Sequence, residues 1–115
     1  DAEAVDELER LAVLMESSEL DEFIALDRAF HLSCYDRAET TVLGATVLQL
    51  WNRTHSYRRA YMRIARTDPD RSVHHEHHLI VSAIRRQDAD EAERVLAGHI
   101  RRTRLELTRH PDIFE

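Results

Sequence analysis

The sequence is poor in the residues that reverse the direction of a polypeptide chain. It contains two glycines and two prolines among 115 residues. A fold built from short strands needs turn residues at each reversal, so this scarcity argues against sheets. We expect long helices joined by few loops, and this length suits one domain.

Cysteine, lysine and long apolar runs are also scarce or missing. Cys34 is the only cysteine, which excludes an intrachain disulfide and favours a reducing, cytoplasmic location. No apolar run is long enough to cross a bilayer, and no signal-peptide pattern precedes the first helix, so no membrane association is expected. The net charge is -6, and all 16 basic residues are arginines. An acidic chain without a basic stripe is a poor candidate for binding duplex DNA directly.

Apolar residues recur at helical spacing along most of the chain. The pattern predicts five helices, over about residues 2–17, 19–36, 40–66, 72–84 and 89–111. Thr40 or Thr41 is expected to cap the third helix, and Asp88 with Glu91 forms a capping-box pattern before the fifth. Residues 67–71 form the clearest predicted loop. The predicted fold class is all-α, an antiparallel helical bundle.

Four polar residues lie on the apolar faces of three predicted helices. Asp27 and His31 lie one turn apart on the second helix, His77 on the fourth and His99 on the fifth. Burying such groups without partners is costly, and one divalent cation would satisfy all four, because imidazoles and a carboxylate are good ligands for Zn²⁺ or Ni²⁺. Alternatively, each histidine could hydrogen-bond a backbone carbonyl or a tyrosine. Spacing alone leaves both interpretations open.

Other polar residues carry weaker signals. His74, His75 and His78 crowd around His77, but on a helix they point in several directions, and most are expected to face water. Arg58 lies on an inward line of the third helix. It is expected either to meet an anionic ligand or to pair with an acid and extend to the surface.

The sequence resembles a known family at three places in order. These are D-x-x-F-H at residues 27–31, E-H-x-x-I-x-x-A-I at residues 76–84, and Asp88, Ala92 and His99 on the last helix. Together they resemble the FCD effector domain of the FadR subfamily of GntR transcriptional regulators. The resemblance covers roughly residues 2–109.

The resemblance implies a helical bundle around a central cavity, with a metal ion bound by one Asp and three His. The matching positions are Asp27, His31, His77 and His99. It also implies a small organic acid as the effector. Arg58, because of its inward line, is the candidate contact for this acid, and no enzymatic activity is expected. Members of the family carry an N-terminal winged-helix domain that binds DNA, usually as a homodimer. That domain and the family's first effector-domain helix are missing here, so residues 1–115 are expected to be part of a longer regulator.

Three other kinds of function stay open. A metal-dependent hydrolase would need a general base and an open coordination position; Glu76 is the nearest candidate base, but as a neighbour of His77 it is expected on a different face. A di-metal bundle would need paired Glu-x-x-His motifs, which the apolar stripes do not supply. A purely structural helical module is the remaining alternative.

Overall fold

The computed structural model describes residues 2–36, 41–65 and 72–114. Within these ranges the chain forms six α-helices, a short 3-10 helix and no strand. The elements are α1 (Ala2–Glu16), α2 (Leu20–Asp36), α3 (Thr41–Arg53), α4 (His55–Ala65), α5 (Ser72–Arg85), α6 (Ala89–Arg109) and η1 (Pro111–Phe114). The predicted all-α fold is therefore confirmed.

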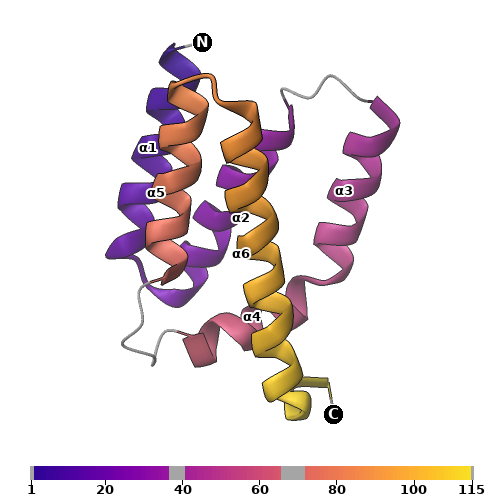
Figure 1. Cartoon of the computed structure of the whole chain (residues 1–115). Helices are drawn as coiled ribbons and strands as arrows, with labels where there is room; N and C mark the ends of the chain where they lie inside the picture. Colours follow the sequence, from indigo (N-terminus) through magenta and orange to yellow (C-terminus); the bar gives the residue numbers. More distant parts are fainter. Residues whose placement is uncertain (1, 37–40, 66–71, 115) are drawn as a thin grey trace.

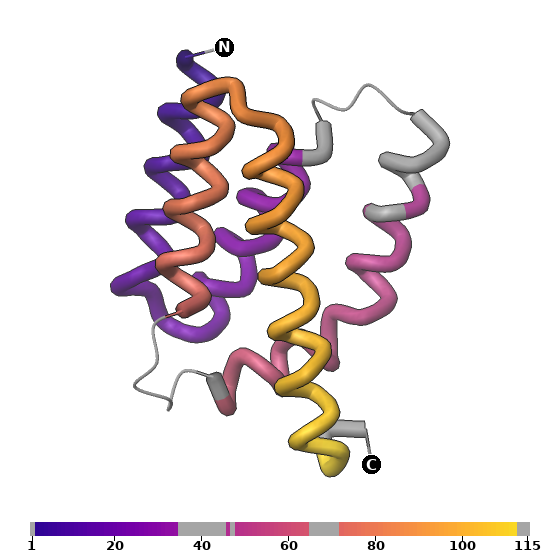
Figure 2. Tube along the Cα trace, in the orientation of Figure 1, coloured from indigo at the N-terminus to yellow at the C-terminus, as the bar shows by residue number. Residues whose placement is uncertain are grey.

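The helices form a bundle in which α1, α2, α5 and α6 lie alongside one another (Figure 1). Helices α1 and α2 run in opposite directions, as do α5 and α6. Helix α4 crosses the end of the bundle near the C-terminus, where it packs against α2 and η1. Figure 2 shows that α3 lies to one side of this group and leads directly into α4. Helices α2, α5 and α6 thus face a shared interior.

The core consists of apolar residues at helical spacing, as predicted for α1, α2 and α5. On the predicted third and fifth helices, in contrast, Leu50, Tyr57, Ile100 and Leu105 are exposed. Helix α1 contributes the largest share, because five of its side chains at helical spacing are buried, and α2, α4 and α5 add the rest. The buried apolar residues are Val5, Leu8, Leu11, Ala12, Met15, Phe23, Ile24, Phe30, Tyr61, Met62, Ile80, Val81 and Ala83.

The turn between α5 and α6 is fixed by hydrogen bonds at both helix ends. Gln87 adopts a positive φ of 58°, and its N–H donates to the Ile84 carbonyl while the Asp88 N–H donates to the Ala83 carbonyl, both at 2.9 Å. This is the Schellman pattern of a helix C-terminus. Asp88 then caps α6, as predicted, by accepting the Glu91 N–H at 3.1 Å. The turn holds α5 and α6 side by side and so sets the spacing of His77 and His99.

The third predicted helix is wrong in one respect, because it is two helices. The chain bends at Thr54, between α3 and α4. The Thr54 hydroxyl donates to the Leu50 carbonyl at 2.8 Å, and Arg58 donates to the Thr54 hydroxyl and the Trp51 carbonyl. Side-chain bonds of this kind compete with the backbone ladder and bend helices. Apolar periodicity continues across the bend, so it could not reveal it.

Some predictions lie outside the described residues. They are the Thr40 cap and the loop at residues 67–71. Among the helices that the structure does describe, none has both the length and the apolar character to span a bilayer.

Candidate metal centre

Three helices bring the four predicted polar residues into the interior of the bundle. Asp27 and His31 come from α2, His77 from α5 and His99 from α6, and all four side chains are buried. His77 has no exposed surface at all. Each of the four residues lies on the apolar face of its helix, so burial of that face buries the polar group as well.

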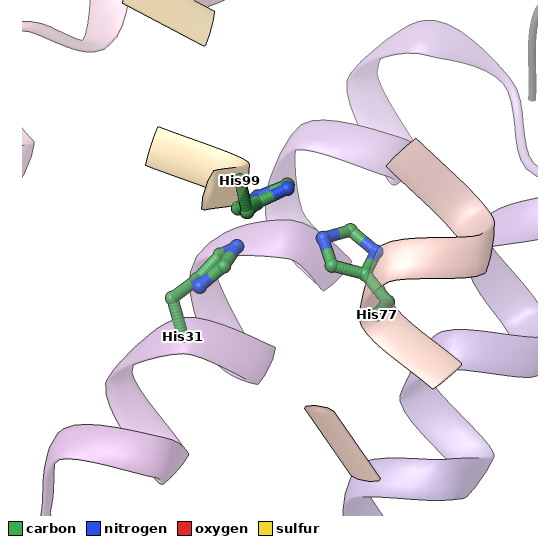
Figure 3. Close-up of side chains that lie close together, drawn as sticks. All are labelled: His31, His77 and His99. Atoms are coloured by element: carbon green, nitrogen blue, oxygen red, sulfur yellow. The ribbon is translucent and has the colours of Figure 1, made fainter. Parts of the chain in front are cut away.

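The three histidines form a compact cluster (Figure 3). Each ring offers one nitrogen to the cluster, and these three nitrogens all lie within 4.8 Å of one another. The ring centroids are separated by 5.3 Å for His31 and His77, 5.2 Å for His31 and His99, and 5.0 Å for His77 and His99. Three imidazoles from three helices therefore converge on one point.

Asp27 lies at the edge of this cluster and contacts two of its members. Its Oδ1 atom is 3.3 Å from Nε2 of His31 and 3.3 Å from Nε2 of His77. Two donors bound to one ion at about 2.1 Å lie about 3.0 to 3.4 Å apart in octahedral or tetrahedral coordination. The observed spacings fall in that range, so these three residues fit a shared cation.

Hydrogen bonding leaves part of this cluster unsatisfied. Within the described part of the chain, neither ring nitrogen of His77 makes a hydrogen bond, and the 3.3 Å contacts of Asp27 Oδ1 lack hydrogen-bond alignment. A buried polar group without a partner costs about 1–3 kcal/mol. A cation on these atoms would satisfy them, and neutral imidazoles with a carboxylate are the donor set that Zn²⁺ or Ni²⁺ prefers. The residues present thus fit such an ion.

Electrostatics keeps Asp27 and His99 in the protonation state that a cation needs. Burial opposes the ionised form of Asp27, but the contacts from His31 and His77 outweigh it and lower the pKa of the Asp27 carboxyl. Burial, followed by the neighbouring His77 and His31, lowers the pKa of His99 to about 3. At neutral pH Asp27 is therefore a carboxylate and His99 a neutral imidazole. Both are ready to act as ligands without releasing a proton.

Glu76 is a buried residue whose place the sequence pattern did not predict. Its Oε2 atom lies 3.6 Å from Nδ1 of His99, and its Oε1 atom lies 3.0 Å from Nε of Arg102. Its side chain is 10% exposed. As expected, Glu76 lies on a different face of α5 from His77. That face packs against α6, which explains why Glu76 is buried. A signal was present in the sequence, since Glu76 belongs to the E-H motif.

Arg58 does not reach inward as a free cation. It is half-buried, donates to the Trp51 carbonyl and to the Thr54 hydroxyl, and lies over the Trp51 ring. Its pKa is lowered by burial, and the charge of Asp27 counteracts this shift. The guanidinium therefore lies within electrostatic reach of the candidate metal centre while it stabilises the bend between α3 and α4.

Aromatic side chains surround the cluster. The Phe30 ring is fully buried, 4.8 Å from the His77 ring and 5.3 Å from the His31 ring. The Trp51 ring lies 5.3 Å from the His31 ring. These apolar walls exclude water and so strengthen any charge interaction at the centre.

The neighbouring histidines of α5 do not join the cluster. His75 is exposed, His78 approaches Glu16 of α1 at 3.3 Å, and His74 packs edge-on against Phe23. The expectation that they point in several directions is confirmed. Among the described residues, only His31, His77 and His99 form a group of metal-ligand type.

Comparisons with known proteins identify the family of this chain. Searches of curated proteins and of solved structures found no match. The family model of the FCD domain, in contrast, matches residues 1–102, most of the sequence. The chain belongs to the FCD domain family, the effector-binding regulatory domain of GntR-type transcriptional regulators.

Proposed function

We propose that this domain binds a divalent metal ion through Asp27, His31, His77 and His99 and senses a small organic carboxylate beside it. The observation that carries the proposal is the buried convergence of three histidines and one carboxylate, in which neither nitrogen of His77 hydrogen-bonds to any residue that the structure describes. Effector binding would control an attached DNA-binding domain, as the family membership suggests. A homodimer and a cytoplasmic location stay predictions.

The charges around the centre favour an anionic effector. When bound, a divalent ion would supply two positive charges and coordination positions for a carboxylate oxygen. Asp27 offsets one of these charges, and the nearby Glu76 is itself paired with Arg102. The site would therefore keep a net positive charge in surroundings walled by Phe30 and Trp51. A small acid fits this environment better than a neutral analogue or a long acyl chain.

Arg58 is the proposed second contact for the acid. A guanidinium has five N–H donors, and its bonds to Trp51 and Thr54 use two of them. The charge of Asp27 affects the pKa of Arg58. The guanidinium therefore lies close enough to the centre to influence an anion bound there. A hydroxy acid or dicarboxylate could contact the ion at one end and the guanidinium at the other.

The hydrolase alternative is less well supported by the geometry. Glu76, its candidate base, faces His99 and Arg102 in an ion-paired position between α5 and α6. A carboxylate held in this way is poorly placed to take a proton from a water molecule at the centre. The position of Glu76 suits support of a ligand better than catalysis.

Calorimetric titration of the zinc-loaded chain tests the proposal. Small mono-, di- and hydroxycarboxylates are compared with the matching amides and alcohols. Binding of acids that weakens at least tenfold, about 1.4 kcal/mol, in His99→Ala supports the sensor. If no acid binds better than its neutral analogue, the carboxylate-sensor proposal is wrong. If zinc itself does not bind, the domain is a structural module instead.

A further inference from the structure

Glu76 and His99 meet across the interface of α5 and α6. Glu76 approaches the His99 ring at Nδ1, with 3.6 Å between that nitrogen and Oε2. Both side chains are at most 10% exposed, so water competes little for either. A neutral imidazole carries one proton, on either Nδ1 or Nε2. The position of that proton decides which nitrogen can bind a cation.

A carboxylate beside Nδ1 favours the tautomer that is protonated there. Glu76 offers only acceptor atoms at that position. At 3.6 Å the contact is electrostatic and longer than a hydrogen bond, so a proton on Nδ1 is attracted to the carboxylate while a lone pair there would face negative charge. The tautomer with the Nδ1 proton has its lone pair on Nε2. Metal-binding histidines commonly have a carboxylate on the second nitrogen, which fixes the ring and strengthens the ligand.

Arg102 forms an ion pair with Glu76. Its Nε atom lies 3.0 Å from Oε1 of Glu76, the oxygen that does not face His99. The Arg102 side chain is 55% exposed, so the buried carboxylate is connected to the surface through a solvated guanidinium. The ion pair balances the charge of Glu76, and each carboxylate oxygen faces a different neighbour, although the Arg102 contact lacks hydrogen-bond alignment among the described residues.

We infer that Glu76 is a positioning residue for the metal centre. Its carboxylate, 3.6 Å from Nδ1 of His99, favours the tautomer with the proton on Nδ1, which leaves the lone pair of Nε2 for the ion, and Arg102 pairs with it. This inference rests on the proposed function, since it concerns how one of the proposed ligands is prepared. It assigns to Glu76 and Arg102 a role beyond packing of α5 against α6.

Glu76→Gln is the decisive variant, because it preserves volume and hydrogen-bonding capacity. Arg102 can only donate, so it takes the amide oxygen and turns the amide NH₂ group toward Nδ1 of His99. That arrangement favours the opposite tautomer, with the proton on Nε2. We expect the zinc Kd, measured by competition with a chromophoric chelator, to rise about 10- to 100-fold. Glu93→Gln, at an exposed position of α6, is the matched control and should leave Kd unchanged.

The tautomer can be observed directly. Long-range ¹H–¹⁵N correlation spectra of the metal-free protein at neutral pH should show His99 protonated on Nδ1 in the wild type and shifted toward Nε2 in Glu76→Gln. A purely structural role of Glu76 would not move this signature. The wild-type spectrum decides even if the variant fails to fold, because a proton on Nε2 of His99 would overturn the inference.

A double variant tests the part played by Arg102. In Glu76→Gln with Arg102→Leu, no guanidinium claims the amide oxygen, so the oxygen can turn to His99. The double variant should therefore bind zinc more tightly than Glu76→Gln alone. Equal or weaker binding would show that Arg102 does not orient residue 76.

The outcomes separate this inference from the function on which it rests. If wild-type protein does not bind zinc, the proposed function fails. If wild-type protein binds zinc and Glu76→Gln matches it in both Kd and His99 tautomer, the metal centre stands and the role of Glu76 is refuted.

Discussion

The guanidinium of Arg58 lies over the indole ring of Trp51, with its central carbon 4.2 Å from the ring centroid. The same indole lies 5.3 Å from the ring of His31. Arg58 thus connects the bend between α3 and α4 to the edge of the histidine cluster through one aromatic side chain. A ligand that draws Arg58 away from Trp51 would act on the bend as well as on the site, which offers a route from effector binding to a change in helix arrangement.

Replacing Arg58 should affect both stability and effector affinity. Arg58→Ala removes the donors to the Trp51 carbonyl and the Thr54 hydroxyl, and we expect a loss of about 1 kcal/mol in the free energy of unfolding, measured by urea denaturation. The affinity for the best-binding acid should fall at least about tenfold in calorimetry. Arg63→Ala, at an exposed position of α4, serves as control. Unchanged acid affinity in Arg58→Ala would refute the effector role and leave the metal site intact.

Metal content should depend on the buried histidines and not on their exposed neighbour. We expect about one divalent ion per chain in wild-type protein, and under about a tenth of an equivalent in His77→Gln, because an amide replaces a strong imidazole ligand. His75→Gln changes an exposed histidine of the same helix and should retain the ion. Elemental analysis after supplementation with zinc measures all three. Full occupancy in His77→Gln would contradict the proposed ligand set.

Removing the ion should lower the melting temperature. The ligands come from α2, α5 and α6, so an ion that binds only the folded chain stabilises it by mass action. The gain is about 2.7 kcal/mol when the free ion is at 100 times its Kd, which corresponds to several degrees in a domain of this size. Calorimetric melting with zinc and with a strong chelator checks this. An identical melting temperature after confirmed loss of the ion would count against the site.

The metal-free protein should lose stability in acid. The pKa of His99 is lowered to about 3, whereas a histidine in an unfolded chain titrates near about 6.5. Between these values the unfolded chain binds a proton that the folded chain does not, so the free energy of unfolding rises with pH from about 3 to about 6.5, by at most about 1.4 kcal/mol per pH unit. Asp27, with its lowered pKa, acts in the same direction below its ordinary value.

Urea denaturation across this pH range, with chelator present, measures the dependence. His99→Gln has no group to titrate at that position, so its stability should vary less steeply between pH 4 and about 6.5. A wild-type curve no steeper than that of His99→Gln would show that His99 does not remain neutral in the folded chain.

The amino-acid sequence determined the helices and the side chains that face inward. Apolar residues at helical spacing mark α1, α2, α5 and α6 within a few residues of their observed ends. The same stripes identify Asp27, His31, His77 and His99 as buried, because a polar residue on an apolar face must follow that face into the core. Periodicity is a property of each segment alone, so one sequence suffices for it.

The tertiary structure decided which residues of neighbouring helices those faces contact. The bend at Thr54 depends on side-chain bonds from Arg58 to Thr54 and Trp51, and the role of Glu76 depends on α6 bringing His99 and Arg102 against α5. Helical periodicity gives the direction of a side chain from its own axis, but not the residue that a neighbouring helix places opposite it. Contacts between helices arise from packing across distant segments, and only the folded chain brings those segments together.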